Sequence, residues 1–167
     1  MQSMAPHSIL ILGIGNYLMG DEGVGVHAIK VLEKESFPPY VRLLDGGTGG
    51  FHLLASLQEH PSVILIDATM DGSDPGTVRI LHPRFASEFP RALSAHDIGL
   101  RDLIESAILL GNLPETHLVT VSIGALQDMR TELSAAVRDA LPSVVRAVRQ
   151  ILSEFERACE SGADRVP

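Results

Sequence analysis

The sequence predicts an α/β domain in which helices cover both faces of a mostly parallel sheet. Short, unbroken apolar segments alternate along the 167-residue chain with longer segments whose apolar residues recur at helical spacing. Unbroken runs rich in Val, Ile and Leu are typical of strands buried on both faces, as the strands of a parallel sheet are. Strands that alternate with helices therefore favour a single three-layer α/β domain.

Strands are expected at the short apolar segments. One of them follows the turn Asp74-Pro75-Gly76 and lies close in sequence to the strand before it. So brief a connection favours an antiparallel neighbour over a helical crossover. The predicted strands are Ser8–Leu12, Tyr40–Leu44, Ser62–Ile66, Thr77–Leu81 and Leu118–Ile123.

Helices are expected at the longer segments. In the first of them Val24, Ala28 and Leu32 belong to an apolar stripe, and the pair Pro38-Pro39 ends the region. Pro142 should bend the final helix or divide it in two, because proline removes a helical hydrogen bond. The predicted helices are Gly23–Glu35, Gly50–Glu59, Asp97–Leu110 and Leu133–Arg157.

The composition predicts one globular domain over residues 1–167, with a loose tail from about residue 160. Hydrophobic residues make up 45% of the chain, which is typical of a globular protein. The formal net charge of −8 argues against nucleic acid as a partner. No apolar run is long enough to span a bilayer, and Met1–His7 lacks the pattern of a secretory signal. We therefore expect no membrane insertion and a cytoplasmic location.

Three polar residues fall where ligands bind in such a domain. Glu22 follows the first strand and its turn, Asp67 follows the third strand, and His96 precedes the third predicted helix. The carboxyl ends of the strands in an open α/β sheet share one edge, and ligands bind there. Two carboxylates and an imidazole that meet at this edge suit a divalent metal of borderline softness. For a hydrolase, water activated near a bound metal is then the simplest chemistry.

Each of these residues also has a purely structural interpretation. An acidic residue in a first helical turn, such as Glu22, is stabilised by the helix dipole by about 0.3–1 kcal/mol. Asp67 could cap a turn, although a carboxylate at the end of a central strand is costly unless it is paired or bound to metal. His96 could cap a helix. Four other histidines lie away from the expected carboxyl ends, and we interpret them as structural or surface residues: His27, His52, His60 and His117.

Several familiar kinds of active site are disfavoured. Gly13 and Gly15 follow the first strand as in a dinucleotide-binding turn, but Leu18 occupies the position of the third glycine. A tight turn is the better interpretation, and a nucleotide-binding module is the third hypothesis. The chain has no Gly-x-Ser-x-Gly elbow and no His-Glu-x-x-His helix. Cys159 lies late in the final helix or tail with acidic neighbours, which oppose formation of a thiolate, so we do not expect it to be catalytic.

Five short segments follow one another in order from the first strand to about Leu110: GIGNYLMGDEGVG (13–25), DGGTGG (45–50), IDA (66–68), PGT (75–77) and SAHDIGL (94–100). Single segments are unspecific, but the ordered set resembles the maturation endopeptidases of nickel–iron hydrogenases. The resemblance implies a twisted five-stranded sheet with one antiparallel strand and helices on both faces. It also implies that Glu22, Asp67 and His96 match the metal-contacting, catalytic positions of that family.

The same resemblance implies a substrate and a metal. Enzymes of this family remove a C-terminal extension from the precursor of the hydrogenase large subunit after nickel has been inserted. The nickel would be carried by the precursor rather than bound permanently by the enzyme, and the triad would grip it there. We expect the protein to act as a monomer. The alternative hypothesis is a non-catalytic nickel checkpoint or chaperone for hydrogenase assembly.

A cleft for the substrate chain is expected around the triad, with Asp21 as a reserve metal ligand. The residues expected to line it are Asn16, Asp21, Asp45, Gly46, Gly47 and Thr48. The resemblance weakens after Leu118. Family members often carry a Pro-Glu-containing stretch after the last strand, whereas residues 122–128 here are Ser-Ile-Gly-Ala-Leu-Gln-Asp. This departure leaves the preferred large subunit and the cut site open.

Overall fold

The computed structural model describes residues 9–90 and 99–163, with side chains described as far as Ala158. These residues form one five-stranded sheet in the order β2-β1-β3-β5-β4. Four strands run parallel, and β4 runs antiparallel to β5 at one edge. The strands are β1 (Ile9–Ile14), β2 (Val41–Gly47), β3 (Ser62–Thr69), β4 (Val78–Leu81) and β5 (Glu115–Ser122). The described helices are α1 (Val24–Leu32), α2 (Leu53–Gln58), α3 (Leu100–Leu109) and α4 (Ala135–Ala163), with short 3-10 turns at η1 (Gly20–Gly23), η2 (Gly50–His52) and η3 (Ala86–Glu88).

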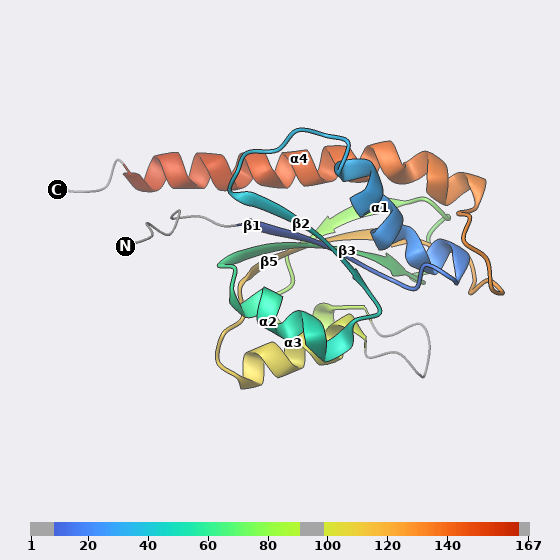
Figure 1. Ribbon diagram of the computed structural model, residues 1–167, viewed down its shortest axis with the longest axis horizontal. Coiled ribbons are helices and arrows are strands. Elements are labelled where there is room, and N and C mark those ends of the chain that lie inside the picture. Colours follow the sequence, from blue (N-terminus) through green and yellow to red (C-terminus); the bar gives the residue numbers. More distant parts are fainter. Residues whose placement is uncertain (1–8, 91–98, 164–167) are drawn as a thin grey trace.

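Helices cover both faces of the sheet, which confirms the predicted fold class. In Figure 1, α1 and α4 lie on one face and α2 and α3 on the other. Alternate residues of β1 divide between the two cores. Ile9 and Ile11 belong to the core that includes α1 and α4, whereas Leu10 and Leu12 belong to the core under α2 and α3. The first strand is apolar without interruption because both of its faces are buried.

The antiparallel strand is confirmed, but its neighbour differs from the expected one. The prediction placed it beside the third strand, because the two are close in sequence. Instead β5 lies between β3 and β4 and pairs with all eight residues of β3. Seven of the eight residues of β5 are buried, on alternating faces, so this longer strand takes the inner position, and the short β4 forms the edge. The connection from β3 to β4 crosses the end of β5, where the Gly76 N–H donates to the Ser122 carbonyl at 2.8 Å.

One predicted helix boundary and one predicted strand boundary were wrong. The third helix begins at Leu100, and its N-cap is Gly99 rather than His96. The Asp102 carboxylate accepts the Gly99 N–H at 3.0 Å, an interaction that fixes this start. His96 lies outside the described residues. His117, expected to precede a strand, lies within β5.

The final helix is one continuous element. α4 runs from Ala135 to Ala163 through Pro142, so the proline does not divide it. Pro142 lies on the exposed side, where water can satisfy the carbonyl that loses its helical partner. The opposite side packs on the sheet through a row of buried residues that includes Val137, Val144, Val148 and Ile151. The helix continues past residue 160, where a loose tail was expected to begin.

Candidate active site

Glu22 is held at the carboxyl edge of the sheet by a tight turn. The chain leaves β1 and reverses through Gly15 and Gly20, whose φ angles of +146° and +58° favour glycine. A Cβ atom at Gly15 would lie closer than 3.0 Å to the Glu22 carbonyl oxygen. The reversal places η1 against β3 and leaves the Glu22 side chain only 7% exposed. The first of the expected ligands is therefore fixed by backbone geometry rather than carried on a mobile loop.

Asp67 lies near the carboxyl end of β3, paired in register with Thr120 of β5. Its side chain is partly buried, and its Oδ1 accepts the N–H of Ala68 at 2.8 Å. Burial raises the pKa of Asp67 to about 8, with a further increase from the charge of Glu22 and an opposing effect of the Ala68 N–H. The charge of Glu22 contributes to this pKa, so the two carboxyl groups lie within electrostatic reach of each other. At neutral pH Asp67 is thus mainly a neutral acid.

The packing of α1 on the sheet constrains the backbone that carries Glu22 relative to the backbone that carries Asp67. Gly25 is the second residue of α1. It packs against the backbone of Ile14 in β1 and of Ile66 in β3. A Cβ atom there would lie closer than 3.0 Å to the carbonyl oxygens of Ile14 and Ile66. Ile66 is the neighbour of Asp67, and η1 leads directly into α1. Close contact at this glycine therefore sets the position of Glu22 relative to Asp67.

Asp21 has a structural role in the folded protein. Its side chain is 3% exposed, and its Oδ1 accepts the N–H of Ser134 at 2.7 Å. The Asp21 N–H donates to Gln127 Oε1 at 2.9 Å, and the Gln127 amide also approaches Asp21 Oδ2 at 3.4 Å. The neighbouring Gly20 N–H donates to the Arg130 carbonyl at 2.8 Å. Asp21 thus ties the turn that carries Glu22 to the segment before α4.

This docking involves the residues between β5 and α4. Residues 127–134 support the turn of Glu22 through main-chain and side-chain hydrogen bonds. His27 adds to the same contact, because its Nε2 lies 2.9 Å from the Thr131 carbonyl oxygen. Leu18 and Met129 are exposed on the two docked segments. Of the atypical segment 122–128, Gln127 takes part in this contact, and the remaining contacts are made by Arg130, Thr131 and Ser134.

The glycine-rich loop after β2 lies beside the first turn. The Gly15 N–H donates to the Gly47 carbonyl at 3.0 Å, and Asp45 Oδ1 accepts the Gly47 N–H at the same distance. Asp45 and Thr48 are exposed, whereas Gly46 is buried against Leu12. Asn16 is partly exposed, and its Oδ1 accepts the Leu18 N–H at 3.0 Å. A role for these residues in holding the substrate stays a prediction.

The structure has a hollow beside Asp67 that was not predicted from the sequence. It has a volume of about 520 Å³ and is lined in part by Thr69, Met70, Phe89, Arg101 and Thr120. Thr120 is the residue paired with Asp67, so the hollow begins next to that carboxyl group. Its lining comes from β3, β5, α3 and the segment around η3, which are far apart in sequence. No single motif could have indicated it.

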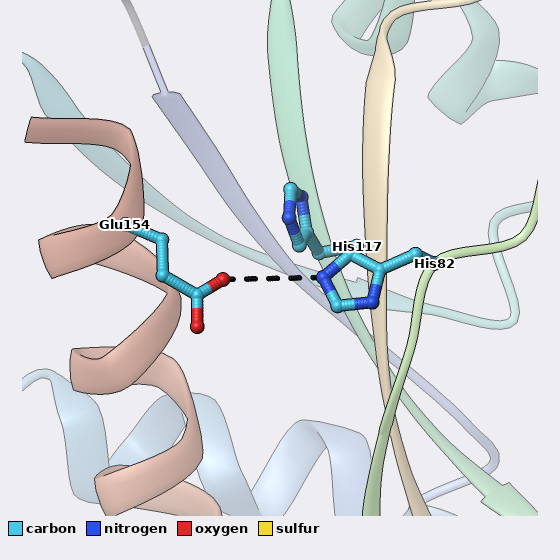
Figure 2. Close-up of side chains that lie close together, drawn as sticks. All are labelled: His82, His117 and Glu154. Carbon is cyan, nitrogen blue, oxygen red and sulfur yellow. Dashed lines mark ion pairs between the residues drawn. The ribbon is translucent and has the colours of Figure 1, made fainter. Parts of the chain in front are cut away.

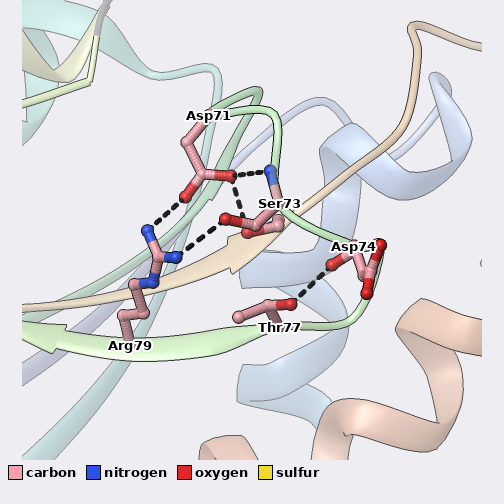
Figure 3. A network of polar contacts seen from close by, with 6 residues as sticks. Asp71, Ser73, Asp74, Thr77 and Arg79 are labelled. Atoms are coloured by element: carbon pink, nitrogen blue, oxygen red, sulfur yellow. Dashed lines mark hydrogen bonds and ion pairs between the residues drawn. The ribbon is translucent and has the colours of Figure 1, made fainter.

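The turn from β3 to β4 is held by a network of polar contacts (Figure 3), and two members of the network, Asp71 and Arg79, also line this hollow. Asp71 accepts the Ser73 N–H at 3.0 Å and the Ser122 hydroxyl at 2.9 Å, and it pairs with Arg79 at 2.9 Å. The hydrogen bond from Ser73, together with those from the hydroxyls and the charge of Arg79, holds the pKa of Asp71 below its usual value. Asp71 is therefore charged at neutral pH, in contrast to Asp67.

A family model described as hydrogenase maturation protease matches residues 26–153. The chain belongs to this family. The match covers more than half of the sequence and includes Asp67 and His96, while Glu22 lies just before it. The interpretation of the ordered segments as a family resemblance is confirmed.

Curated relatives and solved structures point the same way. The hydrogenase expression/formation protein HoxM of Azotobacter vinelandii is 38% identical over 157 residues, which is 90% of this chain and 75% of HoxM. The hydrogenase 2 maturation protease of Escherichia coli K12 is 32% identical over 166 residues and 95% of both chains. The structure of the hydrogenase maturating endopeptidase HybD from E. coli matches with a TM-score of 0.72 and 34% identity, over 86% of this chain and 93% of that one.

The protein is thus a hydrogenase maturation endopeptidase, as the sequence predicted. Within the described ranges, none of its helices has the length and apolar character needed to cross a membrane.

Proposed function

We propose that this endopeptidase removes the C-terminal extension of a hydrogenase large-subunit precursor after nickel insertion, and that Glu22, Asp67 and His96 bind the nickel carried by the precursor. The observation that carries the proposal is the pair of carboxyl groups at the carboxyl edge of the sheet. Glu22 is fixed there by η1, and Asp67 by β3. The family and the position of the pair in the fold support the assignment.

The protonation of Asp67 suits a metal that arrives with the substrate. A carboxyl group with a pKa of about 8 holds its proton at neutral pH until a cation replaces it. Nickel brought by the precursor would displace this proton and gain two carboxylate oxygens from the enzyme. An imidazole from His96 would complete a ligand set that suits a borderline metal. The site thus discriminates between precursor with nickel and precursor without it.

The role of the metal in this proposal is to position the substrate. A nickel ion held between precursor and enzyme would fix the scissile peptide at the edge of the sheet, which converts a loose encounter into an oriented one. The hollow beside Asp67 would receive the chain next to the scissile bond, and the exposed Leu18 and Met129 would contact the apolar surface of the large subunit. Asp45 and Thr48 would contact the chain from the loop after β2.

The alternative is a nickel checkpoint or chaperone that binds the same precursor without cutting it. A nucleotide-binding role has less support, because the glycine turn after β1 serves to place Glu22. The two remaining functions share the metal ligands and differ only in the outcome for the substrate.

Incubation with nickel-loaded and nickel-free precursor tests the proposal. We expect the wild-type protein to shorten only the loaded precursor, and Glu22→Gln to reduce the rate at least a hundredfold, because an amide is a poor nickel ligand. Mass spectrometry of the large subunit measures the product. The matched control is Glu59→Gln. It changes an exposed carboxylate at the C-terminal end of α2 and should leave the rate unchanged.

Each other result has a clear meaning. Tight binding of loaded precursor without cutting would favour the checkpoint. Equal cutting of loaded and nickel-free precursor would contradict nickel recognition. A folded Glu22→Gln variant with the normal rate would remove Glu22 from the site.

A further inference from the structure

We propose that His82, His117 and Glu154 form a second binding site for a divalent transition metal, separate from the carboxyl pair. His82 follows β4, His117 lies in β5, and Glu154 lies on α4 (Figure 2). One donor atom from each of the three side chains lies within 4.8 Å of the others. Among the described residues this is the group of histidines and acids that could hold a metal ion.

The cluster and the carboxyl pair lie on different parts of the sheet. His117 precedes Thr120, the partner of Asp67, by three residues, which is roughly 10 Å along a strand. His117 also lies on the face that α4 covers, since the same side of β5 carries Val119 and Val121 of that core. A metal in the cluster would therefore not be shared with Glu22 and Asp67.

The cluster combines one rigid donor with two adjustable ones. His117 is 6% exposed, and its ring packs edge-on against Phe155 and His82 at centroid distances of 4.7 and 4.5 Å. The side chains of His82 and Glu154 are 57% and 37% exposed, so they can rotate. Donors around a tetrahedral zinc ion lie about 3.3 Å apart. His82 Nε2 and Glu154 Oε2 are already 3.9 Å apart, so small rotations bring the set to this spacing.

His117 is not committed to a structural hydrogen bond through Nδ1. That atom is buried and has no hydrogen-bond partner in the part of the chain that the structure describes. A buried histidine with a purely structural role normally satisfies such an atom, as His60 does with the Ser56 carbonyl at 2.7 Å. Glu154 is oriented in turn, since its Oε1 accepts the Gln150 amide at 3.1 Å while Oε2 faces His82.

The chemistry of the set favours zinc or nickel over calcium or magnesium. Two imidazoles and one carboxylate are the protein ligands of many zinc sites, with a fourth position left for water. The metal would link the edge strand β4, β5 and the C-terminal helix α4.

Zinc chloride or nickel sulfate added to the tag-free, metal-free protein tests this site. Calorimetry is done in the Glu22→Gln background, so that the carboxyl pair contributes little. We expect one zinc ion per chain and a rise in melting temperature. His82→Ala and Glu154→Gln should each weaken binding at least tenfold and abolish the rise. These changes are on exposed side chains, so the fold should persist, and His52→Ala is the matched control because it removes an exposed histidine elsewhere.

Two further measurements locate the bound zinc and show whether the site is separate from precursor processing. A crystal of the protein soaked in zinc chloride should give an anomalous peak among His82, His117 and Glu154, and His82→Ala should process precursor at the wild-type rate. The inference is overturned if the background protein binds no zinc, if His82→Ala and Glu154→Gln bind zinc as tightly as their parent, or if the peak lies elsewhere.

Discussion

Asp67→Asn is expected to abolish precursor processing and, at the same time, to make the folded protein more stable at neutral pH. Processing should fall at least a hundredfold because the variant loses an anionic oxygen that nickel requires. The gain in stability follows from the raised pKa of Asp67. At neutral pH Asp67 is ionised in the unfolded chain and must take up a proton when the protein folds, which costs free energy. Asparagine carries no charge in either state and avoids this cost.

The direction of the pH effect can be worked out from the two pKa values. The Asp67 pKa is about 8 in the folded protein, against a usual value of 3.8. Between these values the folded state binds one proton more than the unfolded state, so stability falls as pH rises. Asp67→Asn removes this fall, and its free energy of unfolding should exceed that of the wild type by roughly 1–3 kcal/mol at pH 7. The difference should shrink toward pH 4.

Urea unfolding at pH 4, 5.5, 7 and 8 measures this difference. Asp71→Asn is the matched control, because the pKa of Asp71 is lowered by its hydrogen bonds and by Arg79. The contribution of Asp71 to stability is present above its unfolded pKa, so this variant should be less stable than the wild type at pH 7. A loss of stability in Asp67→Asn that is as large as in Asp71→Asn would show that Asp67 is charged in the folded protein.

Gly25→Ala should destabilise the protein by about 3 kcal/mol and impair processing further than its stability explains. Alanine normally favours a helix over glycine by about 1 kcal/mol, so the expected loss opposes helix propensity. The added Cβ would lie closer than 3.0 Å to the carbonyl oxygens of Ile14 and Ile66, and backbone atoms cannot rotate away. α1 would have to move off the sheet and carry η1 and Glu22 with it.

Thermal unfolding and the processing assay measure the two effects. The control is Gly124→Ala, whose Cβ would approach the Pro75 ring at 3.3 Å, a contact that a small shift relieves. Unchanged stability in Gly25→Ala would mean that α1 does not depend on this close approach.

The fold class could be predicted from the sequence because each strand and helix is indicated by a pattern within its own segment. The uninterrupted run of β1 and the amphipathic stripe of α1 each reflect burial that one segment experiences by itself. The position of β4 could not be predicted in the same way. Its neighbour is decided by competition with β5, which lies over thirty residues further along the chain and offers β3 a longer partner with seven buried residues.

The site was predictable in part for a similar reason. Asp67 lies at the end of an apolar strand, and Glu22 follows the turn after another, so a rule about parallel sheets predicts that both lie at one edge of the sheet. The structural role of Asp21 depends on Ser134 and Gln127, more than a hundred residues away, and no pattern around Asp21 indicates them. His117 was interpreted as structural because it lies far from the carboxyl ends. Its neighbours are His82, which follows β4, and Glu154, which lies on α4, and only the structure shows how these elements pack.

The central claim is that the carboxyl pair binds nickel while the nickel is still in the precursor. Nickel-edge X-ray absorption on a freeze-trapped complex with loaded precursor tests it most directly. We predict that wild-type protein adds oxygen ligands from the carboxyl pair to the nickel, and that the folded double variant Glu22→Gln, Asp67→Asn adds no such oxygen ligands. A nickel spectrum identical to that of precursor alone, in a complex that goes on to be processed, would contradict the claim.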